Sequence, residues 1–551
     1  MEKPWLAHYA PGVEAEVDVL KYNSIVELFD KYANKYADNN AFISMHTELS
    51  YRELREKSEA FAAYLQHKMG LKKGDKFAIM TPNVLQYPIA LFGAIKAGLT
   101  IVNVNPLYTA RELKHQLNDS GATAILVIEN FAHVLAKVVD ETPIEHVITT
   151  QIGDCIGLLK GALVNTMVKR VKKMVPPFSL PDLVKFNQVL KQGSKLSFIP
   201  VDISREDIAF LQYTGGTTGV AKGAMLSHAN IVANMLQIKG GLGGIIEENK
   251  EMMVTALPLY HIYALTVNCL SMMTVGGCNL LIANPRDLPM FAKVISQYPV
   301  TLFTGVNTLF NGLLNEQVFK EIDFSSWKMS IAGGMATQRS VADRWHKLTG
   351  TSILEGYGLT ECSPCATSSP VNQTEFTGSI GLPISNTEAK VVDDQGKEVA
   401  TNEPGELCIK GPQVMVGYYN RPEATAEILQ DGWLATGDIA RMDERGYIFI
   451  VDRKKDMILV SGFNVFPNEI EEVVAMIDDV IEVAAIGVPC EKTGEKVKLF
   501  LATKSGELNE EAIVAHCREN LTSYKVPREF ELRGELPKTN VGKILRKELR
   551  A

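Results

Sequence analysis

Residues 213–223 read Tyr213-Thr214-Gly215-Gly216-Thr217-Thr218-Gly219-Val220-Ala221-Lys222-Gly223. They follow an apolar run, Ile208 to Leu211, that is typical of a buried strand. The glycines allow a tight turn and a close approach of the backbone to a ligand. Backbone N–H groups of such a loop form a concavity that binds anions, and Lys222 adds a positive charge. The stretch therefore predicts a phosphate-binding loop behind a strand.

This loop differs from a P-loop of the Walker type. The Walker motif needs a contiguous Gly-Lys-Ser/Thr that opens a helix, whereas Lys222 lies three residues after Gly219 and precedes another apolar run. The alternative interpretation is a Gly/Thr-rich surface turn that binds nothing.

A second segment, Gly356-Tyr357-Gly358-Leu359-Thr360-Glu361, follows a short apolar run, Ser352 to Leu354. Tyr357 could stack on a nucleotide base. Glu361 could hold Mg²⁺, which prefers one or two carboxylates together with substrate oxygens. The alternatives are a core aromatic residue and a solvated helix start.

Three further segments follow along the chain: Asp431-Gly432-Trp433-Leu434-Ala435-Thr436-Gly437-Asp438, Val451-Asp452-Arg453-Lys454-Lys455-Asp456 and Pro537-Lys538-Thr539-Asn540-Val541-Gly542-Lys543. Together the five segments resemble the ordered motif set of adenylate-forming acyl-CoA synthetases, and most of all that of the bacterial long-chain fatty acid CoA ligases. The resemblance covers essentially the whole chain. It includes Pro258-Leu259-Tyr260-His261-Ile262-Tyr263 and Ser461-Gly462-Phe463-Asn464-Val465-Phe466-Pro467-Asn468-Glu469.

The resemblance implies an enzyme that activates a long-chain fatty acid with ATP and Mg²⁺ and passes it to coenzyme A. A carboxylate is a poor acyl donor, so it first attacks the α-phosphate of ATP and releases pyrophosphate. Such a transfer depends mainly on positioning and electrostatic stabilisation. The residues implied in nucleotide binding are Tyr213, Thr214, Gly215, Gly216, Thr217, Thr218, Gly219, Gly333, Gly334, Gly356, Tyr357, Gly358, Asp438 and Arg453.

The catalytic residues implied by the resemblance are Lys222, His261, Thr360, Glu361 and Lys543, with Glu361 as the magnesium ligand. From its local sequence alone, Lys543 would be a solvated surface lysine. The resemblance instead places it over the α-phosphate and the attacking carboxylate. It also implies that a C-terminal lid rotates about a hinge at Lys455 and brings Ser461-Gly462 to the pantetheine arm of coenzyme A.

Substrate choice depends on the acyl pocket. Gly358 adds no side chain where acetate-using relatives carry a tryptophan that closes the pocket, so a long chain is sterically allowed. Each buried methylene contributes roughly 0.8 kcal/mol, so an open apolar tunnel favours long chains. Leu265 stands where some long-chain relatives have a gating tryptophan, so that kind of gate is not expected. The candidate wall residues are Tyr260, His261, Tyr263, Val306, Leu309, Phe310 and Gly358.

Other functions remain open at this point. A medium-chain or aryl-acid CoA ligase would use the same motifs. An amino-acid adenylating domain would need a carboxylate for the substrate amine, and Pro258 to Leu265 has none. A fatty-acyl-AMP ligase usually has an insertion after the hinge, where Asp456 here runs directly into Met457. A fatty-acid binding or uptake protein without turnover would not need Lys222, Glu361, Asp438 and Lys543.

Composition and charge agree with a globular enzyme. The chain has 551 residues, 46% of them apolar and 22% charged, which predicts several domain-sized units. A net charge of −8 argues against a nucleic-acid-binding protein, which would be expected to be basic. Eight scattered cysteines and no signal peptide favour free thiols in a cytoplasmic protein, and the spacing of Cys362 and Cys365 is taken as coincidence. The sequence is compatible with a homodimer but does not decide the oligomeric state.

The expected fold is α/β. Capping boxes at Ser50 to Glu53 and Thr109 to Glu112 open helices, and apolar runs predict buried strands between them. This alternation predicts mixed sheets covered by helices. The resemblance divides the chain into an adenylating and acyl-binding region of several subdomains at residues 1–451, a hinge at 452–456 and a small α/β lid at 457–551. The charge-free stretch Val254 to Pro285 contains Pro258 and Gly276-Gly277, so a buried helix, a turn and a strand are expected rather than a membrane span.

One segment suggests contact with a membrane. Between Leu163 and Val175 the apolar residues fall on one side of a helical wheel, while Lys169, Lys172 and Lys173 gather on the other. A cationic amphipathic helix of this kind can lie in a membrane interface, here on the inner face of the cell membrane. Arg170 lies at the edge of the apolar face and weakens the pattern, and packing against the protein body is the alternative.

Overall fold

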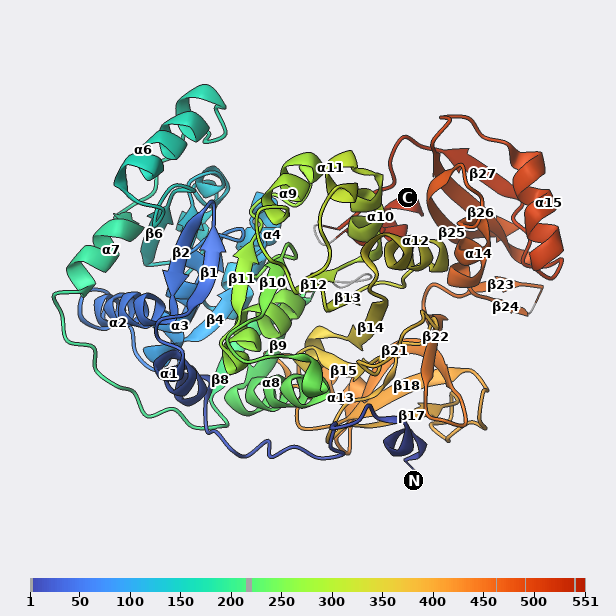
Figure 1. The fold of residues 1–551 in the computed structure, drawn as a ribbon, viewed down its shortest axis with the longest axis horizontal. Coiled ribbons are helices and arrows are strands. Elements are labelled where there is room, and N and C mark those ends of the chain that lie inside the picture. Colours follow the sequence, from blue (N-terminus) through green and yellow to red (C-terminus); the bar gives the residue numbers. More distant parts are fainter. Residues whose placement is uncertain (1–2, 215–220, 462, 491, 540–541, 551) are drawn as a thin grey trace.

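The computed structural model describes residues 3–214, 221–461, 463–490, 492–539 and 542–550. A large body built on three sheets is followed by a smaller C-terminal lid with a sheet of its own, which lies at the right in Figure 1. Alternating helices and strands form these layers, so the α/β expectation is confirmed. The eight cysteines are free, Cys362 and Cys365 among them.

The first sheet of the body has eight strands in the order β19-β9-β8-β4-β3-β5-β6-β7. Strands β8 and β9 form an antiparallel pair that joins Thr214 to Lys222, so the glycine-rich loop connects their ends. The strands are β3 Lys76–Met80, β4 Thr100–Asn103, β5 Ala124–Ile128, β6 His146–Thr150, β7 Val184–Lys185, β8 Ile208–Thr214, β9 Lys222–Ser227 and β19 Gly417–Tyr418.

The second sheet has nine strands in the order β16-β15-β14-β13-β12-β10-β11-β1-β2. Its central strands are parallel, and β14 ends in the motif that contains Tyr357. The strands are β1 Asn40–Ser44, β2 Thr47–Ser50, β10 Met252–Thr255, β11 Cys278–Leu281, β12 Leu302–Gly305, β13 Met329–Ala332, β14 Ile353–Gly358, β15 Cys365–Ser368 and β16 Leu382–Pro383.

The third sheet and the lid sheet have five strands each. The third sheet consists of β17 Glu388–Val392, β18 Gly405–Lys410, β20 Leu429–Gln430, β21 Trp433–Met442 and β22 Ile448–Arg453. The lid consists of β23 Ile458–Val460, β24 Phe463–Val465, β25 Val480–Cys490, β26 Gly494–Thr503 and β27 Glu529–Leu532, with helices α14 Pro467–Val474, α15 Glu510–Asn520 and α16 Arg546–Leu549.

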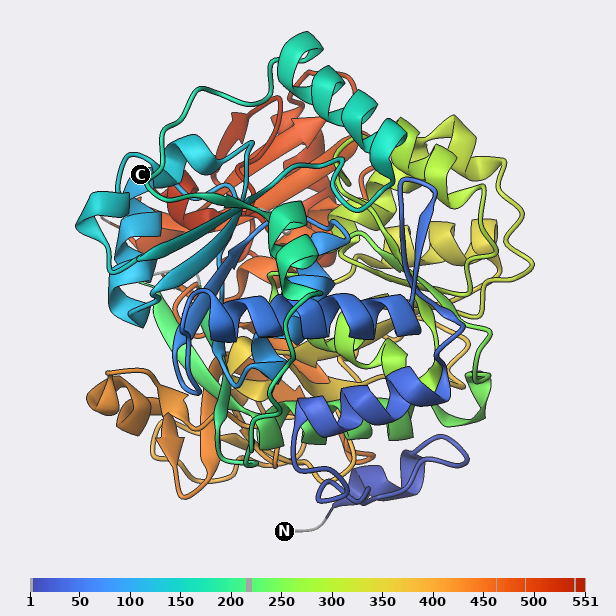
Figure 2. The same cartoon turned by 90° about the vertical axis from the view of Figure 1, so that its left-hand side faces the viewer.

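Helices cover the sheets of the body, and Figure 2 shows the long helices near the N-terminus lying across one face. Both predicted capping boxes are present, at the start of α2 and of α4. The helices are α1 Ile25–Lys35, α2 Tyr51–His67, α3 Gln86–Lys96, α4 Ala110–Ser120, α5 Ala132–Leu135, α6 Leu158–Thr166, α7 Phe186–Gly193, α8 His228–Gly241, α9 Leu288–Ile295, α10 Asn307–Asn315, α11 Gln317–Lys320, α12 Arg339–Thr349 and α13 Pro422–Ile428.

The charge-free stretch after β10 is buried in the body. It forms a π-helical segment, Ala264–Leu270, and a 3₁₀ turn, Met272–Val275, and Gly276 then turns the chain into β11 at a φ of 67°. This confirms the expected helix, turn and strand, although the helix is wound more loosely than an α-helix. Within the described ranges, none of the helices combines the length and the apolar character needed to cross a bilayer.

Candidate active site

A cavity of about 1580 Å³ lies where the first two sheets, the third sheet and the lid meet. Most of the described residues that the sequence singled out line this cavity, although they are spread over more than 300 residues of chain. These lining residues are Tyr213, Thr214, Lys222, His261, Tyr263, Val306, Gly333, Gly334, Gly356, Tyr357, Gly358, Thr360, Glu361, Asp438, Arg453, Lys455 and Lys543. Gly215, Gly216, Thr217, Thr218, Gly219 and Gly462 lie outside the described residues.

The β8–β9 pair brings Lys222 next to Glu361. The ammonium nitrogen of Lys222 lies 5.1 Å from the centre of the Tyr418 ring. The hydroxyl of Tyr418 donates a hydrogen bond of 2.5 Å to Oε1 of Glu361. A cation and a carboxylate therefore face the cavity on either side of one tyrosine, which suits a site for phosphate and a divalent cation.

The Glu361 carboxylate is nearly buried, with 9% of the residue exposed. The described residues contain no group of three or more His, Cys, Asp and Glu side chains that could hold a metal ion. The Glu361 carboxylate fits Mg²⁺ without a further acidic cluster, because Mg²⁺ binds through one or two carboxylates plus waters and phosphate oxygens.

Asp438 connects the second sheet to the third. Its Oδ2 accepts a hydrogen bond of 2.6 Å from the hydroxyl of Tyr357, and its Oδ1 lies 2.9 Å from Nε of Arg453. Asp438 and Arg453 are directly paired residues of β21 and β22, so the sheet register brings them together. Burial raises the pKa of Tyr357, with a further contribution from the Asp438 charge, so its hydroxyl stays a donor.

Two glycines of the site are required by close packing. A Cβ on Gly358 would lie 2.0 Å from the carbonyl oxygen of Pro364, and a Cβ on Gly333 would lie 3.0 Å from the Tyr263 ring. Any side chain at residue 358 would therefore displace the backbone of the neighbouring segment.

Lys543 enters the cavity from the lid. Oγ1 of Thr308 in the body donates a hydrogen bond of 3.2 Å to the carbonyl oxygen of Gly542, which has a φ of 83°. Burial lowers the pKa of Lys543 to about 8, and the charge of Arg453 adds to the effect. Burial also lowers the pKa of His261 to about 4, and the charge of Lys543 contributes to that shift. Lys543 is thus a partly buried cation that shares the cavity with His261, and not a solvated surface lysine.

The N-terminal part of the chain, residues 29–419, matches the profile of the AMP-binding enzymes, and residues 469–543 match the profile of the AMP-binding enzyme C-terminal domain. The chain belongs to the AMP-binding enzyme family. Long-chain-fatty-acid–CoA ligases of Salmonella typhimurium and Haemophilus influenzae are 57% and 54% identical to it, each over 100% of this chain and 98% of the relative. The resemblance to adenylate-forming acyl-CoA synthetases is therefore confirmed.

Solved structures of AMP-binding enzymes share the fold. An anthranilate CoA ligase in complex with anthranoyl-AMP is 25% identical, with a TM-score of 0.83, over 96% of this chain and 97% of that one. ATP-bound MatB from Rhodopseudomonas palustris is also 25% identical, with a TM-score of 0.79 over 96% and 98% of the two chains. Apo MatB, 26% identical over the same shares, has a TM-score of 0.73. The overall match is thus better to the ATP-bound structure of MatB than to the apo structure.

The cavity of this AMP-binding enzyme is lined by only some of the candidate acyl-wall residues. Tyr263 and Val306 line the cavity, whereas Tyr260, Leu309 and Phe310 do not. Phe310 is fully buried in an aromatic cluster, with ring centres 4.7 Å from Trp345 and 5.4 Å from Phe303. Leu265 is fully buried and also does not line the cavity.

Sequence reasoning missed the wall at the end of α8. Most of this wall is one small apolar cluster, which contains Met329 and Leu354 and has Leu242, Ile331 and Val371 packed against it. A Cβ on Gly241 would meet nothing within 4 Å, so the last turn of α8 borders open space. The glycines between 240 and 244 are the only sequence signal for this wall. Its cavity-lining members are Ile238, Gly241, Leu242, Met329, Ile331, Leu354 and Val371.

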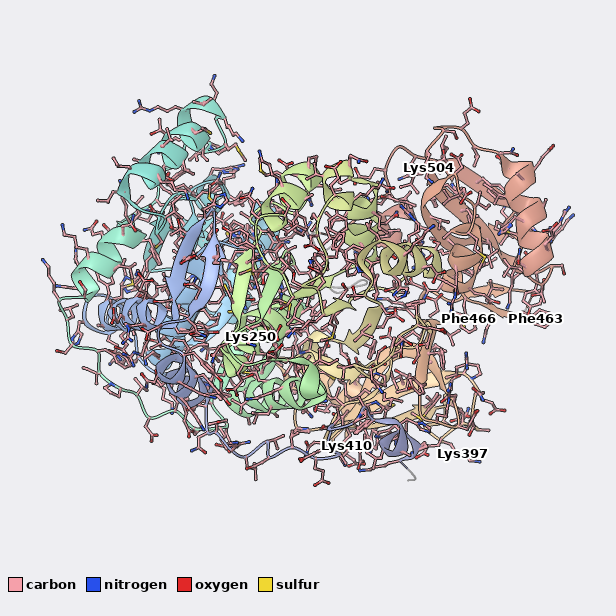
Figure 3. The ribbon with its side chains drawn as sticks, viewed as in Figure 1. Lys250, Lys397, Lys410, Phe463, Phe466 and Lys504 are labelled. Carbon is pink, nitrogen blue, oxygen red and sulfur yellow. The ribbon has the colours of Figure 1, made fainter. Side chains whose placement is uncertain are left out.

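Ser461, expected near coenzyme A, does not line the cavity. Phe463, two residues later, lies with Phe466 at the lower edge of the lid in the view of Figure 3. Its ring is 4.7 Å from that of Tyr524, and 55% of the residue is exposed. In this arrangement the lid presents Lys543 to the cavity and holds the Ser461 turn outside it.

Proposed function

We propose that this AMP-binding enzyme activates long-chain fatty acids with ATP and transfers them to coenzyme A. The single observation that carries the proposal is one cavity that joins the β8–β9 pair, Glu361, the Asp438–Arg453 pair and the lid residue Lys543. The long-chain acid as substrate is inferred from the function of relatives that are 54–57% identical over the full chain.

In the first half-reaction, a carboxylate oxygen of the acid forms a bond to the α-phosphorus of ATP. The bond to the β-phosphate breaks and pyrophosphate leaves. We assign the phosphates to Lys222 and the glycine-rich loop, the ribose hydroxyls to Asp438 and Arg453, and the adenine to Tyr357 with Gly333 and Gly334. Thr360 lies beside Glu361 at the phosphates. Mg²⁺ held by Glu361 would neutralise charge on the phosphate oxygens.

Lys543 supplies positive charge at the position where the transition state becomes most negative. Donors that are already in place at such a site stabilise the transition state without reorganisation. His261 is neutral at neutral pH, because its pKa lies near 4. It can therefore donate or accept a hydrogen bond at the acyl carboxylate without adding charge.

In the second half-reaction, the thiol sulfur of coenzyme A attacks the acyl carbon, the bond to the phosphate oxygen breaks, and AMP and the thiol proton leave. We propose that the lid, residues 457–551, rotates about residues 452–456, with Lys455 as the hinge residue. The rotation would withdraw Lys543 and bring Ser461 and Gly462 to the pantetheine arm. The position of the Ser461 turn outside the cavity supports the need for this rotation.

A coupled assay tests the function. Purified protein is given ATP, Mg²⁺ and acids of increasing chain length, and pyrophosphate and the coenzyme A thioester are both measured. We expect both products, with the highest kcat/KM for long chains. A preference for medium-chain or aryl acids would redefine the substrate, and fatty acid binding without pyrophosphate release would indicate a binding or uptake protein.

Helix α6 and the π-helical segment that follows it, Met167–Val171, carry an apolar stripe that the body does not cover. Leu159, Leu163, Met167 and Val171 recur at a spacing of four residues and are 89%, 65%, 44% and 73% exposed. Leu158, one residue earlier, is 94% exposed. The alternative of a helix packed against the body therefore does not hold for these side chains, and Figures 1 and 2 show α6 projecting from the edge of the molecule.

The charge around this stripe is positive. Residues 155–181 contain no Asp or Glu, and they include Lys160, Lys169, Arg170, Lys172 and Lys173. Exposed apolar side chains bordered by lysines suit the interface of an anionic membrane. We propose that the stripe makes the chain a peripheral protein on the cytoplasmic face of the cell membrane.

Cosedimentation with liposomes that contain phosphatidylglycerol tests this contact. We expect binding to be lost when Lys169, Lys172 and Lys173 become Glu. Binding should be kept when Lys185, Lys191 and Lys195, which are exposed on and beside α7, become Glu. This control changes the net charge of the protein by the same amount. Equal binding by both variants would rule out the contact. If Leu159→Ser and Leu163→Ser instead convert a dimer to a monomer, the stripe is the interface of a homodimer.

A further inference from the structure

A cluster of charged side chains joins the hinge to the end of the lid. Its centre is Arg546, three residues after Lys543. The guanidinium is 2.7 Å from Oε2 and 2.8 Å from Oε1 of Glu471, and it donates a hydrogen bond of 2.7 Å to Oδ1 of Asn468. It also lies 3.4 Å from Oδ2 of Asp456 and 4.0 Å from Oδ1 of Asp452. These five residues are called the hinge cluster below.

Asp452 is the member of the hinge cluster that belongs to the body. It lies in β22, where it pairs with Ile439 of β21, before the turn at residues 454–456. Its Oδ2 nevertheless accepts a hydrogen bond of 2.9 Å from the backbone N–H of Asn468, near the start of the lid helix α14. Asp452 thus joins the body to the lid across the hinge.

The hinge cluster is largely shielded from solvent, with Asp452 and Asp456 buried and the other three members partly exposed. Asp452 is fully buried, and burial raises its pKa to about 6 although the charge of Arg546 opposes the shift. Burial by itself would lower the pKa of the Arg546 guanidinium. The negative charges of Glu471, Asp452 and Asp456 outweigh this effect and raise that pKa. Removing one partner of such a group leaves buried charges uncompensated.

We propose that the Asp452–Arg546 contact holds the lid in the position that places Lys543 in the cavity. Arg546 is then a positioning residue for adenylation, an inference that rests on the two-step function proposed above. When the lid turns about the hinge, Asp452 stays with β22, whereas Asn468 and Arg546 move with the lid. The contact must therefore break before thioester formation, so it favours the first half-reaction alone.

The two half-reactions test the proposal separately. Acyl-adenylate formation is measured from fatty acid and ATP, and thioester formation is measured from supplied acyl-adenylate and coenzyme A. For Arg546→Met we expect adenylation to fall at least tenfold and thioester formation to change less than twofold. The matched control is Lys498→Met, which breaks an ion pair of 2.8 Å with Glu531 inside the lid, and it should leave both rates within twofold. An equal loss of both half-reactions in Arg546→Met, or no loss, would overturn the proposal.

A double-mutant cycle identifies the partner of Arg546. If the contact acts as a unit, Asp452→Asn combined with Arg546→Met should lower adenylation no further than the worse single variant. Additive losses would instead mean that Arg546 acts only through the loop of Lys543. If Arg546→Met does not fold, Arg546→Lys replaces it, because lysine keeps the charge but lacks the planar guanidinium. The same ratio of adenylation rate to thioester-formation rate is then compared. A parent protein that forms no acyl-adenylate would refute the proposed function and not the contact.

Trypsin provides a readout that does not depend on activity. The hinge contains Lys454 and Lys455, so a lid that leaves its position more often exposes cleavable bonds. We expect faster cleavage at the hinge in Arg546→Met and in Asp452→Asn, with the rate of Lys498→Met unchanged. Equal cleavage rates in all four proteins would contradict the proposal.

Discussion

Lys543 of the lid and His261 of the body share one cavity, and the charge of the lysine helps to lower the pKa of the histidine to about 4. The contact between Thr308 and Gly542 places the two residues in this relation. The same burial lowers the pKa of Lys543 itself to about 8. The position of the lid and the protonation of the site are therefore linked.

Adenylation should lose efficiency in mild alkali. The protonated form of Lys543 is needed, and with a pKa of about 8 its proton is lost as the pH rises through that value. The kcat/KM for acyl-adenylate formation reports the free enzyme and should fall above about pH 8. A guanidinium stays charged throughout this range, so Lys543→Arg should lack the alkaline limb even if its rate is lower. An identical alkaline limb in both proteins would show that another group titrates.

Removal of the lysine should separate the two half-reactions. We expect Lys543→Ala to lower acyl-adenylate formation at least a hundredfold, because the role we propose for this charge is confined to the reacting α-phosphate. Thioester formation from supplied acyl-adenylate should survive, since the lid has then withdrawn this residue. Rapid-quench measurement of both steps gives the comparison. A parallel loss in both would argue that Lys543 has a structural role.

Nucleotide affinity should depend on the Tyr357–Asp438 hydrogen bond. Tyr357→Phe removes the donor from a buried carboxylate that also pairs with Arg453. The carboxylate of Asp438 would then be held less firmly for the ribose hydroxyls that we propose it binds, so the KM for ATP should rise severalfold. Tyr9→Phe, which removes a hydroxyl that donates to the carbonyl oxygen of Pro383, is the control and should leave KM unchanged. Unaltered ATP affinity in Tyr357→Phe would place the nucleotide elsewhere.

Chain-length preference should depend on Gly241. A larger side chain at this residue would extend from the last turn of α8 into the space bordered by Met329 and Leu354. Each methylene excluded from the cavity would cost roughly 0.8 kcal/mol of binding, so Gly241→Leu should lower kcat/KM for long acids and spare short ones. Gly244→Leu is the matched control, because Gly244 also has open space around it but does not line the cavity. The same length profile in both variants would mean that the acyl chain takes another path.

The local elements were predictable because their signals are local. Hydroxyl and carboxylate residues three apart define the capping boxes of α2 and α4, and both formed as expected. The apolar run before Tyr213 became β8, and the run after Gly276-Gly277 became β11. In each case the neighbours along the chain supply the interactions that decide the conformation.

Which of the candidate acyl-wall residues line the cavity was only partly predictable. Tyr263 and Val306 face the cavity, but Phe310 turns into an aromatic cluster with Trp345. An apolar residue near a motif can pack into the core or line a cavity, and the sequence has the same appearance in both cases. Gly241 and Met329 belong to no motif, so their position across the cavity could not be inferred.

The sequence by itself indicated the α/β character, the AMP-binding family and a set of candidate reactive residues, because glycine spacing, charge and apolar periodicity act over a few residues. Only the tertiary structure decided that Lys543 shares a cavity with His261, that Arg546 lies near Asp452, and that the apolar stripe stays exposed. Those relations depend on how distant elements pack, and packing is set by surfaces that assemble only when the whole chain has folded.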